Sequence, residues 1–220
     1  MEAILQEIRS WLEITYFIAG GPVIAVIAYF ALGQIKILKA QVEEQKKALI
    51  ISSRRDALKL TAEQVAFYCE KIIPLQNILN NKLESEGITI LEKFKIEFEE
   101  GSIKVIPPKE EFSFKAFQHI SSELVDAANA MESFSTYFAS GVADEKVAYL
   151  SLGSTFCNSM EILSPILIPI SNEGRRFSAT LRLYTIWGSR LEKENLEKQK
   201  VEIEIKLKSK KKFSVPVVGA

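Results

Sequence analysis

Residues 14–35, ITYFIAGGPVIAVIAYFALGQI, contain no Asp, Glu, Lys or Arg. A helix of about 20 apolar residues crosses the hydrocarbon core of a bilayer, because that core is ~30 Å thick. The stretch therefore predicts one transmembrane helix, with a short N-terminal segment, 1–13, before it. A signal peptide is the alternative. The residues before the stretch argue against a signal peptide, because they are acidic rather than basic. The length of the stretch also argues against one, because a signal peptide has an apolar region of about 7–15 residues.

Basic residues lie mainly on the C-terminal side of this stretch. Only Arg9 precedes it, and six follow closely: Lys36, Lys39, Lys46, Lys47, Arg54 and Arg55. An excess of Lys and Arg marks the cytoplasmic side of a span. We therefore expect a single-pass inner (plasma) membrane protein with its N-terminus outside and its C-terminus in the cytoplasm. The two cysteines, Cys69 and Cys157, lie far apart in apolar surroundings and are expected to be buried, unreactive thiols.

The remainder of the chain has the composition of a folded domain. Hydrophobic residues make up 47% of the sequence, 13 residues are Phe, and 28 basic residues balance 28 acidic ones. A chain this apolar is not a disordered tail. The balanced charge gives no overall indication of nucleic-acid binding.

A long helix is predicted from residue 34 to about 85, with its first part, 36–53, connecting the span to a folded domain. Ile35, Leu38, Val42 and Leu49 have the heptad spacing of a coiled coil. Two interpretations remain open: a short coiled-coil stalk, and a solvated connecting helix that packs on its own domain. Pro74 is expected to interrupt the helix, because proline removes a backbone donor.

The predicted fold class is mainly α: the span, the connecting helix and a cytosolic four-helix bundle, 54–205, with a small β-hairpin. Apolar and charged residues alternate in 94–106 around a turn at Gly101, which is typical of a hairpin. Helical periodicity continues from 116 to 140, from 144 to a limit set by Pro165 and Pro169, and from 175 to about 200. Residues 201–208, VEIEIKLK, alternate like a strand but follow a helix-forming run, and a continuing helix is favoured. Residues 206–220 are predicted to be a basic flexible tail.

No catalytic constellation is found. His119 is the only histidine, the two cysteines are dispersed, and no zinc-binding, P-loop, dinucleotide-binding or nucleophile-elbow motif occurs. We therefore expect no enzymatic activity, no metal site and no cofactor.

Clustered arginines are the best candidates for binding a ligand. The guanidinium fork matches phosphate oxygens, so a nucleotide or single-stranded DNA oligomer is the expected ligand. Tyr184 and Trp187 could stack on its bases. The alternative is salt bridging to nearby carboxylates such as Asp56, Glu192 and Glu194, together with attraction to the membrane surface. The candidate ligand-binding residues are Arg54, Arg55, Arg175, Arg176 and Arg182, with Arg190 near them.

Small residues form a stripe within the span, because Gly21, Ala25 and Ala28 are spaced by four and three residues. Such stripes let two helices approach closely, although small residues are also common in transmembrane helices in general. We predict a homo-oligomer interface at this stripe and the heptad positions after it: Gly21, Ala25, Ala28, Ile35, Leu38 and Val42.

Three segments carry a resemblance to a known group of proteins: ISSRRDALKLTAEQVAFYCEKIIPL (51–75), GVADEKVAYLSLGSTFC (141–157) and WGSRLEKENLEKQK (187–200). With the short acidic N-terminus and single span, the chain resembles small bacterial membrane-anchored helical proteins of anti-phage defence loci. It is similar in layout to the transmembrane effector of the Hailong system. The resemblance implies a partner nucleotidyltransferase whose DNA oligomers hold the membrane protein closed. The expected function is thus an oligomeric membrane effector, and the alternative is a single-pass adaptor that docks a protein partner without forming a pore.

Overall fold

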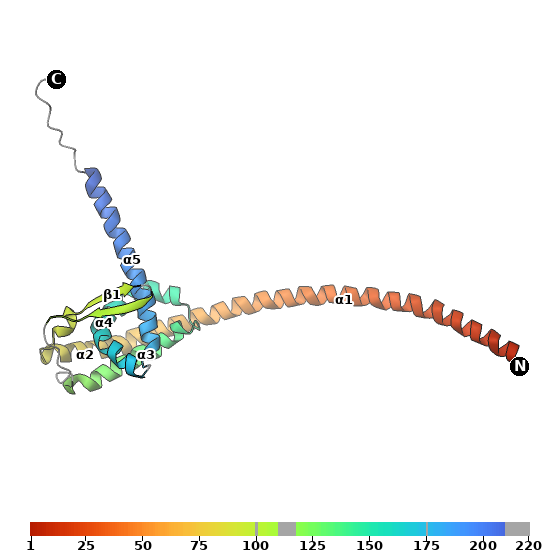
Figure 1. The fold of residues 1–220 in the computed structure, drawn as a ribbon, viewed down its shortest axis with the longest axis horizontal. Coiled ribbons are helices and arrows are strands. Elements are labelled where there is room, and N and C mark those ends of the chain that lie inside the picture. Colours follow the sequence, from red (N-terminus) through yellow and green to blue (C-terminus); the bar gives the residue numbers. More distant parts are fainter. Residues whose placement is uncertain (100, 110–117, 175, 210–220) are drawn as a thin grey trace, which may run out of the picture. The chain divides into compact units, whose positions relative to one another are not determined.

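The computed structural model describes residues 1–99, 101–109, 118–174 and 176–209. Within this part of the chain the protein is mainly helical and has a two-stranded antiparallel sheet (Figure 1). The predicted fold class is confirmed to that extent. The chain divides into two compact units, Met1–Arg55 and Asp56–Ala220.

The first unit is formed by the N-terminal part of helix α1 (Glu2–Phe67). Pro22 lies inside the helix without ending it. Within residues 1–55 no side chain is buried. Among the described residues, this N-terminal helix is the one that is long and apolar enough to cross a membrane.

The second unit begins with the last turns of α1, the π-helix η1 (Tyr68–Ile72) and α2 (Ile73–Ser85). Pro74 lies in the first turn of α2, which follows η1 without a break, so the helix continues across the proline although proline has no backbone N–H to donate. The predicted interruption is therefore a change of helix type, with a wider turn immediately before the proline.

The hairpin consists of β1 (Lys95–Glu99) and β2 (Ser102–Ile106), after a short 3₁₀ helix, η2 (Ile90–Lys93). The strands pair in antiparallel register from Lys95 with Ile106 to Glu99 with Ser102. Gly101 has φ +82° at the turn, a conformation that glycine adopts without steric cost. The hairpin predicted for 94–106 is confirmed.

Three further helices complete the unit: α3 (Ser121–Ala139), α4 (Glu145–Gly174) and α5 (Ser178–Ser209). The limit predicted at Pro165 and Pro169 is wrong, because α4 continues through both prolines. Residues 201–208 belong to α5, so the strand alternative for them is also wrong.

The start of α4 is tied to the end of α1. Asp144 caps α4, since its Oδ1 accepts a hydrogen bond from the Val147 amide at 3.1 Å. The Asp144 amide donates to the hydroxyl of Thr61 at 2.8 Å, and Thr61 is only 1% exposed. The helix predicted to start at 144 thus begins directly after this cap.

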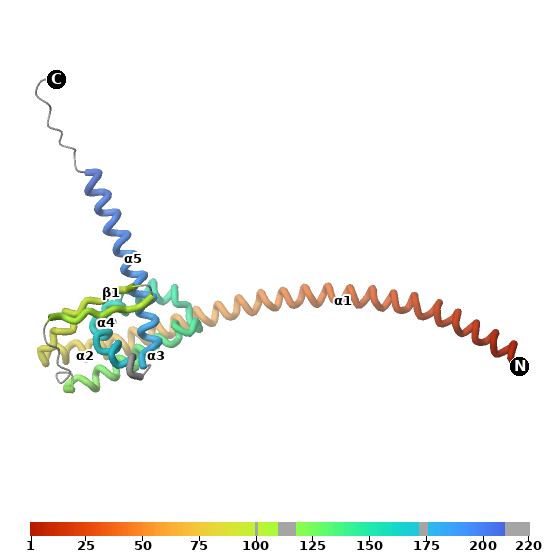
Figure 2. Tube along the Cα trace, in the orientation of Figure 1, coloured from red at the N-terminus to blue at the C-terminus, as the bar shows by residue number. Residues whose placement is uncertain are grey.

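Aromatic side chains form the centre of the core. Trp187 on α5 is fully buried, with its ring 5.0 Å from that of Phe156 on α4. Tyr68 of η1 lies 4.9 Å from Phe134 of α3 by the same measure. Side chains from α2, α3, α4 and α5 thus meet around one cluster. Figure 2 shows the backbone of these helices as a tube.

Candidate functional site

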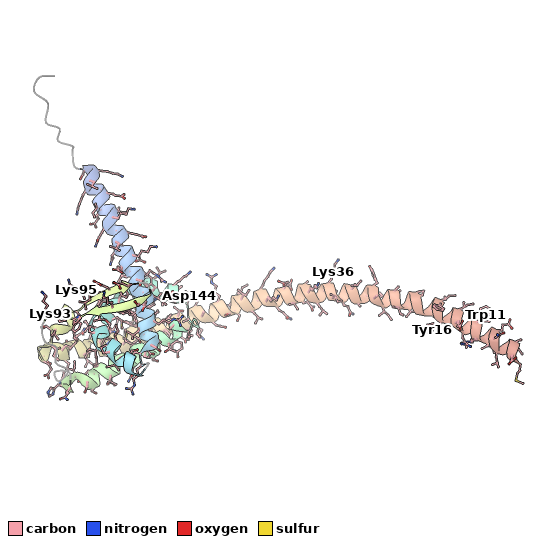
Figure 3. All side chains as sticks on the ribbon, in the orientation of Figure 1. Trp11, Tyr16, Lys36, Lys93, Lys95 and Asp144 are labelled. Atoms are coloured by element: carbon pink, nitrogen blue, oxygen red, sulfur yellow. The ribbon has the colours of Figure 1, made fainter. Side chains whose placement is uncertain are left out.

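The predicted span is an apolar helix surface that no described residue of the chain covers. Its large side chains are between about half and three-quarters exposed, as Ile24 at 67% and Phe30 at 65% illustrate. Trp11 and Tyr16 lie near its N-terminal end and Lys36 follows its other end (Figure 3). Trp and Tyr are enriched where a span meets the headgroups, and Lys marks the aqueous side.

The small-residue stripe leaves room beside the helix. Gly21, Ala25 and Ala28 are all exposed, and a Cβ atom added to Gly21 would meet nothing within 4 Å. A second helix could therefore approach the backbone here, as the packing of transmembrane helices requires.

The heptad positions after the span are also uncovered. Ile35, Leu38 and Val42 are 48%, 58% and 47% exposed. Charged residues border them, and Lys46 Nζ lies 3.2 Å from Glu43 Oε1. An apolar seam with charged flanks is the surface that a two-helix coiled coil buries.

The predicted arginines fall in different parts of the chain. Arg54 and Arg55 lie on α1 in the first unit, and both are exposed. Arg176, just before α5, and Arg182, on α5, are exposed in the second unit. Arg175 lies outside the described residues. Among those described, no ion pair links any of these four arginines to a carboxylate.

The aromatic residues predicted to stack on bases are not available to a ligand. Tyr184 and Trp187 are 1% and 0% exposed, respectively. Burial raises the pKa of the Tyr184 hydroxyl well above its usual value. Their helical spacing therefore reflects core packing, and the stacking prediction is wrong.

Arg190 forms a structural ion pair. Its guanidinium lies 3.0 Å from Glu145 Oε1 at the start of α4, and 4.4 Å from the centre of the Tyr149 ring. The indole N–H of Trp187 donates to the same carboxylate. The salt-bridge alternative thus applies to Arg190, but through Glu145 rather than the predicted Glu192 or Glu194.

A carboxylate already occupies the start of α5. Glu132 of α3 accepts hydrogen bonds from the amides of Ala179 and Thr180 at 3.1 and 2.8 Å, and from the Thr180 hydroxyl at 2.8 Å. Free amides at a helix N-terminus attract anions. Glu132 uses two of those of α5, the Ala179 and Thr180 amides, from within the chain, so a phosphate near Arg176 could not bind these two.

The two cysteines differ. Cys157 is buried, and burial raises the pKa of its thiol to about 12. Cys69 is exposed, so the prediction that it is buried is wrong. It lies within η1, where the wider π-helical turn shifts the sequence relative to the core.

Among the described residues no group of His, Cys, Asp and Glu could hold a metal ion. Comparisons with protein-family models, curated proteins and solved structures gave no match. Sequence reasoning missed three contacts that organise the second unit, those of Thr61, Glu132 and Glu145. In each, the partner is more than 40 residues away in the sequence, and no local pattern signals it.

Proposed function

We propose that this chain is a single-pass inner-membrane effector that assembles through α1, with its N-terminus outside and a four-helix bundle in the cytoplasm. In this proposal the bundle senses a nucleotide or DNA-oligomer signal, and the assembled spans permeabilise the membrane in anti-phage defence. The resemblance to membrane proteins of defence loci supports the biological setting.

The observation that carries the proposal is the uncovered apolar surface of α1. A chain with one span can enclose a pore only if several copies assemble. The stripe at Gly21, Ala25 and Ala28 and the seam at Ile35, Leu38 and Val42 supply surfaces for such assembly, because all six residues are exposed in the single chain.

The oligomeric state of the purified protein tests the assembly. Ala25→Leu with Ala28→Leu should shift the detergent-solubilised oligomer toward monomer, since bulky side chains hold the backbones apart. Ala19→Leu with Val26→Leu is the matched control, because these residues lie on the opposite side of the helix. A monomeric wild-type protein would rule out the pore. An oligomer unchanged by the stripe variant would place the interface elsewhere.

The exposed arginines support the nucleotide signal. Reversal of Arg175 and Arg176 to Glu should abolish binding of a single-stranded DNA oligomer, whereas Lys198→Glu, at an exposed position of α5, should not. Wild-type affinity should fall with salt, with a log–log slope of about −0.7 per phosphate contact. Binding that is insensitive to salt, or that survives the reversal, would contradict this part of the proposal.

A single-pass adaptor that docks a protein partner is the second candidate. The C-terminal part of α5 favours it, because Leu196, Val201 and Ile205 are 58%, 54% and 60% exposed on a helix that other described residues do not cover. An adaptor should be monomeric and should bind no nucleic acid. The detergent-solubilised wild-type protein, with any co-purifying nucleic acid identified, therefore separates the two candidates.

The orientation is tested independently of the assembly. A C-terminal reporter that is active only in the cytoplasm should be active, and one that is active only in the periplasm should be silent. The reverse result would exclude every cytosolic ligand and partner proposed here.

A further inference from the structure

A cavity of about 500 Å³ lies in the second unit, between α3, the C-terminal half of α4 and the segment that leads into α5. This volume is within the range of about 300–1,000 Å³ that is usual for small-molecule sites. Its walls are mainly aliphatic and aromatic, including Leu124, Leu167 and Phe177. Leu167 is only 1% exposed, so the floor of the cavity belongs to the core.

Phe177 has a backbone conformation that its residue type does not favour. Its φ is +60°, in the left-handed region, and among the described residues it is the one non-glycine residue with positive φ. Its carbonyl accepts the first hydrogen bond of α5, from the Leu181 amide at 3.0 Å, so Phe177 occupies the N-cap position. Ser, Thr, Asp or Asn is preferred there, and the capping is performed instead by Glu132. A bulky residue held in a strained conformation indicates a constraint beyond folding.

The polar groups around the cavity differ in the sign of their charge and in whether they already have partners. The Glu132 carboxylate is committed to three donors of α5. Arg176 lines the cavity, is exposed and forms no ion pair with a described residue. Asn129, also exposed, lines it as well. The available groups are thus one cation and one amide beside an apolar wall.

We propose that this cavity binds a single-chain amphiphile with an anionic headgroup, its acyl chain against Leu124, Leu167 and Phe177 and its headgroup at Arg176. A nucleotide fits less well, because one arginine and one amide cannot satisfy several phosphate oxygens, and the walls offer a base or ribose few polar partners. The site shares Arg176 with the arginines proposed above to bind a nucleotide, and it is separate from α1. Its test uses an acyl probe and no nucleotide, so its failure can be distinguished from failure of the proposed function.

Photocrosslinking of the full-length protein in lipid nanodiscs tests the site, with a diazirine-bearing dodecanoate as the probe. Peptide mass spectrometry should locate adducts in 124–132 and 167–177, and excess dodecanoate should suppress them. Nanodiscs are needed because alkyl detergents would compete for the same cavity. Adducts confined to α1, or adducts that dodecanoate does not suppress, would overturn the proposal.

Three variants make the test specific. Arg176→Glu should lower the adduct yield about three- to tenfold, because repulsion replaces an attraction between exposed charges. Arg182→Glu, an exposed arginine that does not line the cavity, should leave it unchanged. Val125→Trp, at a half-exposed position in the lining, should obstruct the cavity and lower the yield without loss of the fold. Equal yields in all three variants and the wild type would exclude this site.

Competition identifies the headgroup. Dodecanoate and dodecyl phosphate should both compete with the probe better than dodecanol does. The anion that competes more strongly shows whether the site prefers a carboxylate or a phosphate headgroup. If dodecanol competes as well as the anions, the role assigned to Arg176 is wrong.

Discussion

Replacement of Glu132 by alanine tests whether one side chain of α3 holds the start of α5. Its carboxylate accepts from the amides of Ala179 and Thr180 and from the Thr180 hydroxyl, at 2.8–3.1 Å. Thr180 is 0% exposed, and the Glu132 carboxylate is the acceptor for its hydroxyl. The loss therefore combines a missing helix cap with a buried donor that has lost its partner.

The magnitude follows from these two contributions. Loss of an N-cap interaction costs about 1 kcal/mol, and a buried donor left unsatisfied costs about 1–3 kcal/mol. Glu132→Ala should therefore lower the free energy of unfolding by about 2–4 kcal/mol. Glu132→Gln keeps one acceptor oxygen, which can serve the two donors of Thr180, but it loses the charge and the acceptor for the Ala179 amide, so we expect an intermediate loss of about 1–2 kcal/mol.

Fluorescence of Trp187 provides the assay. The chain has 2 tryptophans, and a Trp11→Phe background leaves only the buried one. Urea unfolding of this background should show the ordering wild type, Gln variant, Ala variant. Asp126→Ala, which removes an exposed carboxylate from the same helix, is the control and should change little. If Glu132→Ala behaves like this control, Glu132 does not secure α5.

Two further predictions concern the same unit. In Gly188→Ala the new Cβ would lie 2.1 Å from the Phe98 ring, so the hairpin must shift and the free energy of unfolding should fall by about 1–3 kcal/mol. Adding Phe98→Ala to the Gly188→Ala chain should remove most of that loss. If the effects of the two substitutions simply add, the contact does not exist. Burial raises the pKa of Cys157 from 9.0 to about 12, so the thiol loses its proton at a lower pH in the unfolded chain than in the folded one. The free energy of unfolding should therefore fall by up to about 1.4 kcal/mol per pH unit as the pH rises from 9.0 to about 12. Cys157→Ala should make that decline shallower in urea titrations at alkaline pH, and an unchanged slope would show that the thiol does not contribute.

Much of the fold could be predicted because the relevant signals are local. Alternation around Gly101 identified the hairpin, and helical periodicity identified the helical segments on either side of it. The prediction was wrong at the prolines of α4, because the local preference of proline is to end a helix. Ile166 and Leu167, which follow Pro165, are 3% and 1% exposed, and this burial favours continuing the helix despite the lost backbone bonds.

The candidate site was harder to predict, because periodicity does not say which apolar face is covered. Tyr184 and Trp187 have a spacing that suits either a core or a stacking surface, and only contacts with residues far apart in the sequence, such as Phe156, decide between them. Arg190 likewise has nearby carboxylates on its own helix but pairs with Glu145, 45 residues earlier.

The exposed apolar side chains of α1 determine which of two proposed steps, membrane insertion or self-association, must come first. Ten Val, Leu, Ile and Phe side chains in 14–35 are at least 48% exposed. Burying a fully exposed side chain of this kind is worth about 1.5–3 kcal/mol, and these ten are already partly covered by their own helix, so leaving them in water forgoes on the order of 10–20 kcal/mol. That is as large as the stability of a typical folded domain, about 5–15 kcal/mol. A second helix covers only one side, whereas a bilayer covers every side that the second helix leaves free. In the proposed function, membrane insertion therefore comes first, and the proposed self-association through the small-residue stripe would select partners only among spans that are already inserted.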